Sequence, residues 1–246
     1  MRKKLLIAAF ATMPIAVSPA QSLQKNRNQA EIGPQLPCGS ETVSNGSFEE
    51  GNFVPNTAAR FMTLPSGATD LRSWTIFSIG KPPSLPANQL LWFDNNNTAG
   101  VRSPFSDHFI DLTGITDAVP LSLSQQITLE SGRYLLQLAV GWDRPRNPSG
   151  IVMVDWALTP AGQTGSIPYN TVKTDGTSAN NWQLLHDTAI ATNGGPMVLQ
   201  FEAHPGQTVN GSPLQFIGLD NVSLKKLFPP DSRACLEGKK LPPLVK

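Results

Sequence analysis

The apolar and polar positions of this chain alternate with a period of two in a series of short runs. Leu121, Leu123, Ile127 and Leu129, for example, alternate with serine, glutamine and threonine, the pattern of a strand with one buried face. Similar runs cover residues 71–79, 90–94, 108–112, 134–142, 152–158, 182–190, 197–204 and 216–224. Turn residues separate them, and beyond the N-terminus we find no helical period. We therefore expect an all-β protein of about ten strands, arranged as an antiparallel β-sandwich or jelly roll.

Two strand-like segments near the ends of the expected sandwich, 43–51 and 217–224, carry the carboxylates Glu49 and Asp220. This layout predicts that the first and last strands meet. Ca²⁺ binds to oxygen ligands from carboxylates, carbonyls and water, so Glu49 and Asp220 are candidate ligands of a structural calcium ion. Glu50 and Asp111 are weaker candidates. The alternative is that Glu49 caps a turn and Asp220 accepts backbone hydrogen bonds at the strand crossing.

The N-terminus has the organisation of a secretory signal peptide. Three basic residues precede an apolar stretch over residues 5–17, which is interrupted by Pro14 and too short to span a bilayer comfortably. We expect a signal peptide over residues 1–20, a flexible leader over 21–37, a β-sandwich domain over 38–228 and a tail over 229–246. The expected mature protein is soluble, has no membrane span, and lies in the periplasm or outside the cell.

The charge and the cysteine content limit the class of partner and predict a cross-link. Removing residues 1–20, which hold three of the basic residues and no acidic one, changes the formal net charge from +1 to −2. This balance does not favour a nucleic-acid partner, which requires concentrated basic patches. The two cysteines, Cys38 and Cys235, bracket the expected domain. In an exported chain such a pair predicts a disulfide that ties the tail back; two free thiols are the alternative.

Several short motifs resemble a known superfamily. Asn45-Gly46-Ser47-Phe48-Glu49 resembles the first strand of jelly-roll carbohydrate-binding modules of the galactose-binding-like superfamily, and Trp74 lies in their Leu-x-x-Trp-x-Ile pattern. Segments 108–114, 124–127, 131–134 and 219–224 resemble their later parts in the same order.

The likeness covers about residues 41–226. It is closest to bacterial exported "choice-of-anchor" proteins and to plant cell-wall proteins of a related domain of unknown function. The resemblance implies a jelly-roll sandwich that binds carbohydrate and often holds a structural calcium ion at the terminal strands. Many bacterial relatives end in an anchoring signal, and we recognise none here, which favours a free periplasmic or secreted protein.

Carbohydrate-binding proteins offer a flat aromatic platform with a few placed polar groups. Trp92 and Trp142 lie where an apolar strand meets a polar loop, whereas Trp74, Trp156 and Trp182 fall within strand patterns and are expected in the core. The alternative for Trp92 and Trp142 is that both seal the ends of the sandwich. The predicted ligand contacts are Trp92, Asn95, Asn96, Trp142, Asp143 and Arg144.

Catalytic patterns are weak by comparison. The three histidines lack zinc-site spacing, the Gly-x-Ser-x-Gly nucleophile motif is absent, and no spacing singles out a carboxylate pair for glycoside hydrolysis. The sequence therefore predicts an exported, non-catalytic module that binds polysaccharide or a glycosylated surface. The alternatives are a structural or adhesive matrix protein with a protein partner and, with less support, a secreted glycoside hydrolase.

Overall fold

The structure is a computed structural model. It describes residues 36–56, 58–78, 89–114, 121–143, 151–170, 180–187, 190–203, 208–209, 212–213, 216–229, 232 and 235. All of these residues belong to the second of two units of the chain, Pro34–Lys246. The expected signal peptide, most of the leader and most of the C-terminal tail therefore lie outside the described residues.

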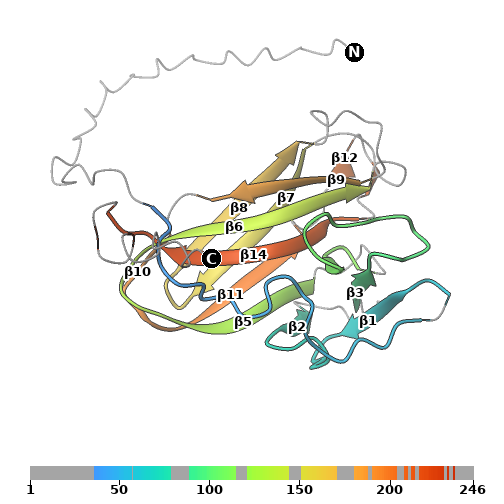
Figure 1. The fold of residues 1–246 in the computed structure, drawn as a ribbon, viewed down its shortest axis with the longest axis horizontal. Helices are drawn as coiled ribbons and strands as arrows, with labels where there is room; N and C mark the ends of the chain where they lie inside the picture. The colour runs from blue at the N-terminus through green and yellow to red at the C-terminus, as the bar shows by residue number, and fades with distance from the viewer. Residues whose placement is uncertain are drawn as a thin grey trace, which may run out of the picture. The chain divides into compact units, whose positions relative to one another are not determined.

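The second unit is an antiparallel β-sandwich, which confirms the predicted fold class (Figure 1). One sheet has seven strands in the order β1-β3-β4-β14-β6-β10, with β9 also paired to β6. The other has five in the order β2-β5-β11-β7-β8, and β12 and β13 form a small separate pair. The strands are β1 (Phe61–Pro65), β2 (Thr75–Ser78), β3 (Gln89–Asp94), β4 (His108–Asp111), β5 (Leu121–Leu129), β6 (Gly132–Asp143), β7 (Ile151–Thr159), β8 (Gln163–Asn170), β9 (Asn180–His186), β10 (Ile190–Thr192), β11 (Gly195–Ala203), β12 (Thr208–Val209), β13 (Ser212–Pro213) and β14 (Gly218–Lys226).

The core lies between the two large sheets and follows the alternation in the sequence. In the five-stranded sheet, Ile76, Leu123, Phe201 and Trp156 are successive cross-strand partners, and all four are buried. Trp74 is buried as well, so the core placement of Trp74 and Trp156 is confirmed. Because one face of each strand packs inward, the intervening residues of the five-stranded sheet form its outer face.

The two chain ends are tied to each other. Leu36 forms an antiparallel bridge with Phe228, and Glu41 forms another with Lys225 at the end of β14. The predicted disulfide between Cys38 and Cys235 is present, with Cα atoms 4.8 Å apart. This cross-link closes a loop that contains the whole sandwich.

The two terminal segments also meet, but the first is not the strand that its pattern predicted. The Val222 amide donates to the Gly46 carbonyl at 2.9 Å, whereas residues 43–51 form turns in which Asn45 and Phe48 have positive φ angles. A Cβ atom on Gly46 would lie 2.0 Å from the Val222 carbonyl oxygen. The close approach to β14 therefore requires glycine here, and this contact replaces a regular strand ladder.

The described residues hold fourteen strands, more than the ten or so expected. Most of the additional ones are too short for their alternation to be recognised, such as β10, β12 and β13. β8 falls in the Gly/Thr/Ser-rich stretch after residue 160, which lies between the predicted runs at 152–158 and 182–190. Within the described part of the chain, no helix has the length and apolarity needed to cross a membrane.

Candidate functional site

The outer face of the five-stranded sheet carries an unusual set of side chains. Strand register places Phe77, Ser122, Glu202, Asp155 and Ser166 in one row that crosses all five strands. Since directly opposed residues of antiparallel strands share a face, these five side chains lie on the same side of the sheet. A second row beside the first consists of Thr75, Ser124, Gln200, Ala157 and Thr164.

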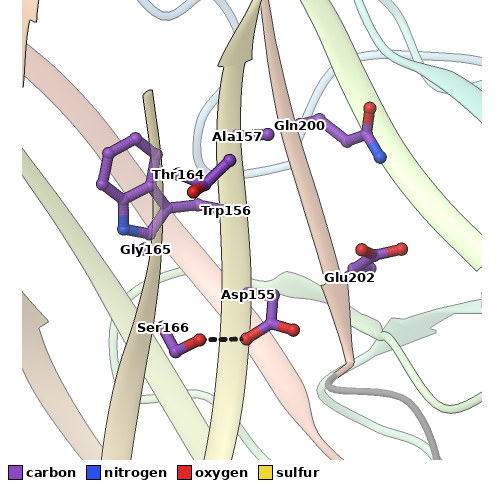
Figure 2. Close-up of a pocket in the computed structure, with 8 residues that line it drawn as sticks. All are labelled: Asp155, Trp156, Ala157, Thr164, Gly165, Ser166, Gln200 and Glu202. Carbon is purple, nitrogen blue, oxygen red and sulfur yellow. Dashed lines mark hydrogen bonds between the residues drawn. The ribbon is translucent and has the colours of Figure 1, made fainter. Parts of the chain in front are cut away.

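This face is hollowed between β8, β7 and β11. The hollow opens to solvent, and its volume is about 550 Å³ when the open solvent at its mouth is included (Figure 2). Within it, the Ser166 hydroxyl donates a hydrogen bond to Asp155 Oδ1. Hydroxyls, an amide and carboxylates thus converge on one shallow space, and all of them come from regular strands. Its lining residues are Asp155, Trp156, Ala157, Thr164, Gly165, Ser166, Gln200 and Glu202.

Phe77 stands at the β2 end of the first row and is 50% exposed. An exposed phenyl ring leaves apolar surface in water, so a ligand that covered it would gain the free energy of burying that surface. Phe77 is therefore the exposed aromatic side chain of this row, whereas the predicted aromatic contacts were tryptophans.

Trp92 does not have the exposed face that a stacking platform needs. Its side chain is 0% exposed, and its indole N–H donates to the Phe48 carbonyl at 3.0 Å. The Phe53 ring packs edge-on against it with centroids 4.9 Å apart. The positive φ angle of Phe48 belongs to the turn that brings this carbonyl to the indole. Trp92 is thus a core residue of the sandwich, in line with the alternative that it seals one end.

Asn95 and Asn96 lie together after β3, but their amides bind the protein itself. Asn95 Nδ2 donates to the carbonyls of Ser103 and Ser106 at 2.9 and 2.6 Å, and Asn95 Oδ1 accepts from the Ser103 amide. Asn96 Nδ2 donates to Asp94 Oδ1 at 3.0 Å. These bonds order the loop over residues 95–107.

The structure does not describe the side chains of the three remaining predicted ligand contacts, Trp142, Asp143 and Arg144. Trp142 and Asp143 are the last residues of β6, and nothing is described of their side chains. Arg144 lies outside the described residues. Their role stays a prediction.

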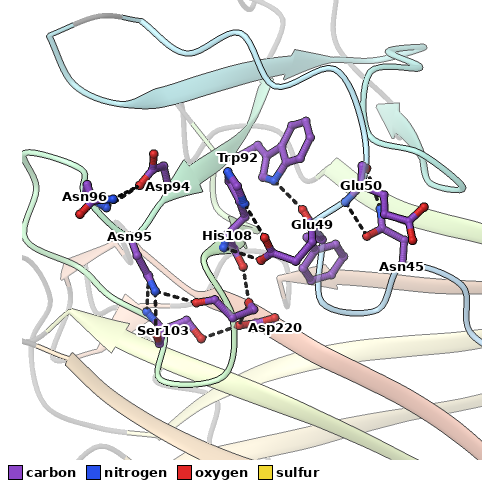
Figure 3. Close-up of polar contacts among 12 residues, drawn as sticks. Asn45, Glu49, Glu50, Trp92, Asp94, Asn95, Asn96, Ser103, His108 and Asp220 are labelled. Atoms are coloured by element: carbon purple, nitrogen blue, oxygen red, sulfur yellow. Dashed lines mark hydrogen bonds and ion pairs between the residues drawn. The ribbon is translucent and has the colours of Figure 1, made fainter.

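The two predicted cation ligands lie near each other beside this loop (Figure 3). Asp220 is 0% exposed, and its Oδ2 accepts hydrogen bonds from the hydroxyls of Ser103 and Ser106. Glu49 accepts from the His108 amide at 2.7 Å, and its Oε2 lies 2.8 Å from His108 Nδ1. The carboxylates come from opposite ends of the chain, as the sequence predicted, and the loop over residues 95–107 joins them.

The chemistry of these donors suits a hard cation, since two carboxylates and two serine hydroxyls supply only oxygen. The two weaker candidates have other partners. Glu50 Oε2 lies 3.1 Å from Arg72 Nη1, with which it forms an ion pair. Asp111 Oδ1 accepts hydrogen bonds from the amide and hydroxyl of Thr113 and from the Ile217 amide. Within the described ranges, no three His, Cys, Asp or Glu side chains gather closely enough to hold a metal ion by themselves. A cation here would therefore need hydroxyl, carbonyl or water oxygens as well.

Burial raises the pKa of Asp220 from 3.8 to about 6, and the nearby negative charge of Glu49 acts in the same direction. The folded protein then binds this proton more tightly than the unfolded chain. The stabilisation is complete below the unfolded pKa and is lost as the pH rises through about 6.

In EDTA we therefore expect the free energy of unfolding to fall by about 2 kcal/mol from this group between pH 4 and pH 7.5. Asp220→Asn removes the titrating group. The free energy of unfolding of this variant, measured with urea, should therefore fall less over the same pH range than that of the wild type. An equal decline in both proteins would contradict the assignment to Asp220.

The sequence motifs did not point to most of the outer-face residues, namely Phe77, Gln200, Glu202, Thr164 and Ser166. A partial signal was present, because Gln200 and Glu202 occupy the polar positions of the alternating run at 197–204. That pattern shows which residues share a face within one strand. It does not show which strands are neighbours, so the rows could not be assembled.

No family model and no curated protein matches the chain. Among solved structures, TmCBM61 in complex with β-1,4-galactotriose matches with a TM-score of 0.43 and 14% identity, covering 76% of this chain and 99% of that one. A CBM4 structure matches with a TM-score of 0.35 and 12% identity, covering 75% of this chain and 99% of that one.

A third match is the K3 cleaved adhesin domain of Lys-gingipain from Porphyromonas gingivalis, with a TM-score of 0.35 and 17% identity, covering 76% of this chain and 100% of that domain. All three TM-scores lie below 0.5. The likenesses therefore carry no conclusion about ligand or activity, and the function must be argued from the site.

Proposed function

We propose that this chain is an exported, non-catalytic module that binds a polysaccharide or glycoconjugate across the outer face of the five-stranded sheet. The observation that carries the proposal is the row that begins with the half-exposed ring of Phe77 and continues through Glu202, Asp155 and Ser166. A sugar ring has one apolar face and a rim of hydroxyls. It matches an exposed aromatic ring on the same sheet face as hydrogen-bonding groups. Here the ring and those groups are separated by Ser122 of β5, which is 1% exposed.

The polar part of the face suits the hydroxyl rim. Carboxylates accept hydrogen bonds, hydroxyls both donate and accept them, and the Gln200 amide does both through different atoms. Because these groups stand on paired strands rather than on loops, binding requires little reorganisation. The five strands span about 19 Å between the outermost pair, a distance that an oligosaccharide covers better than a single sugar.

A glycan array with the mature, oxidised protein tests this proposal. We expect binding to a defined class of linear glycans, stronger for tetrasaccharides than for the corresponding monosaccharide. A blank array from protein that still unfolds cooperatively would overturn carbohydrate binding. It would favour the alternative of a matrix or adhesive protein with a protein partner.

One observation favours the hydrolase alternative. Asp155 and Glu202 are direct cross-strand partners that line the same hollow. The two carboxyl groups therefore share one hollow, and glycoside hydrolysis uses a pair of carboxyl groups that flank the scissile bond. Incubating the bound glycans with the protein and assaying new reducing ends separates the two functions, and we expect none to form.

We also propose that Glu49 and Asp220 hold a structural calcium ion together with the hydroxyls of Ser103 and Ser106. Support comes from the all-oxygen donor set and from the burial of Asp220, whose charged form a cation would stabilise. The residues would hold the ion between the loop over residues 95–107 and β14, where it would stabilise the fold and catalyse nothing. Urea unfolding at pH 7.5 should give the wild type a higher free energy of unfolding in calcium than in EDTA, and Asp220→Asn should show no such gain. Equal stability of the wild type in both buffers would overturn the calcium site.

Export is part of the same proposal. The Cys38–Cys235 disulfide supports it, because disulfides persist in oxidising compartments. We therefore place the mature protein in the periplasm or outside the cell, consistent with a polysaccharide partner.

A further inference from the structure

The second row of the outer face places three different side chains next to one another in the hollow. Gln200 on β11 is the direct cross-strand partner of Ala157 on β7, and Ala157 is in turn the direct partner of Thr164 on β8. All three line the hollow (Figure 2). A ligand in the hollow therefore meets an amide on one side, a methyl group in the middle and a hydroxyl group on the other side.

The Gln200 amide has no hydrogen-bond partner among the residues that line the hollow. The one side-chain hydrogen bond between these eight residues is donated by Ser166, and the Thr164 hydroxyl is likewise without a partner among them (Figure 2). The indole N–H of Trp156 donates to Asp187. Of the lining side chains, Gln200 therefore offers the N–H donor that remains for a ligand.

Resting on the proposed function of this face, we propose that its ligand is a polysaccharide whose sugars carry acetamido groups and that the hollow accepts one of these groups. In a trans acetamido group, the N–H and the C=O point in opposite directions and the methyl group points away from the sugar ring. With the methyl group against Ala157, the C=O accepts from Gln200 Nε2 and the N–H donates to the Thr164 hydroxyl. The row thus matches the three parts of this substituent.

The spacing of the strands suits this arrangement. β11 and β8 flank β7 in the sheet order, so they lie about 9.6 Å apart. The oxygen and nitrogen of an amide are about 2.2 Å apart, and each hydrogen bond adds about 2.9 Å. An acetamido group bonded on both sides therefore spans about 8 Å, and side chains that lean slightly inward cover the difference. Ala157 leaves the space between them open, which a longer side chain would fill.

The preference for acetamido groups should be large enough to measure. A hydroxyl group at the same carbon is too short to reach both Gln200 and Thr164, so a chain without acetamido groups loses the two hydrogen bonds and the contact with Ala157. Each hydrogen bond contributes about fivefold to the affinity, and the two together should give a preference of at least about tenfold.

Isothermal titration of the full mature chain with two matched tetrasaccharides tests the inference. Chitotetraose and cellotetraose have the same β-1,4-linked backbone and differ in carrying acetamido or hydroxyl groups at C2. We expect chitotetraose to bind at least about tenfold more tightly than cellotetraose.

Three variants locate the acetamido group. Gln200→Met and Thr164→Val keep the approximate size of the side chain and remove its hydrogen-bonding group, so each should reduce the preference about fivefold. Ala157→Leu fills the space for the methyl group and should abolish the preference. Gln137→Met is the matched control, because Gln137 is a half-buried strand glutamine of the other large sheet, and it should leave the preference unchanged.

The outcomes separate the inference from the proposed function. Cellotetraose that binds as tightly as chitotetraose would overturn the inference and leave glycan binding in place. The same holds for a preference that Gln200→Met, Thr164→Val and Ala157→Leu all leave unchanged while they melt like the wild type, and for a glycan array whose ligands all lack acetamido groups. Failure of both probes together with a blank array would instead count against the proposed function itself.

Discussion

Replacing both Cys38 and Cys235 with serine is expected to lower the free energy of unfolding by about 5 kcal/mol. The disulfide joins residues 197 positions apart, and the loss of chain entropy in the unfolded state grows with the length of the closed loop. For a domain of this size, such a change corresponds to a fall of about 10–20 °C in the melting temperature. Differential scanning calorimetry of both proteins measures it.

Wild-type protein melted with and without a thiol reductant is the control, because reduction removes the same cross-link without changing a residue. The reduced wild type and the double variant should melt at similar temperatures. An unchanged midpoint in both would show that the antiparallel bridges of Leu36 and Glu41 to the C-terminal end of the sandwich hold the chain ends without the disulfide.

Trp92→Ala is expected to destabilise the fold by about 3–5 kcal/mol, the usual cost of deleting a buried aromatic side chain. The ring is fully buried, contacts Phe53, and donates to the Phe48 carbonyl. Urea unfolding of the variant measures the loss, which a solvent-exposed binding platform would not show.

Trp92→Phe is the matched control. It keeps most of the buried ring but loses the N–H donor, so the Phe48 carbonyl loses its partner at a cost of about 1–2 kcal/mol. A Trp92→Ala protein as stable as the wild type would contradict the core placement and return Trp92 to the candidate ligand contacts.

The sandwich could be predicted because alternation is a local signal. The run from Leu121 to Leu129 is buried on its apolar side as its pattern indicates, with Gln126 and Thr128 exposed on the other. The disulfide followed from the number of cysteines and their positions. The meeting of the terminal segments followed from their shared pattern, a strand-like run that carries a carboxylate. The turn at Asn45 and Gly46 nevertheless replaced the expected first strand.

The site was harder to predict because it depends on contacts between distant parts of the chain. Phe77 and Glu202 lie in one row only because β2, β5 and β11 are neighbours in that register. Trp92 was misplaced for a related reason. Its indole N–H donates to the Phe48 carbonyl, 44 residues away in the sequence. The local sequence pattern around Trp92 does not predict a hydrogen-bond acceptor so far along the chain.

The central claim is that a glycan lies on the outer face of the five-stranded sheet. Isothermal titration of the best array ligand into the wild type, Phe77→Ala and Phe105→Ala tests it most directly. Phe105 is a matched control, because it is also an exposed phenylalanine, at 40%, but lies in the loop over residues 95–107. Loss of at least tenfold in affinity for Phe77→Ala with little change for Phe105→Ala is the predicted result, and the reverse order would contradict the account.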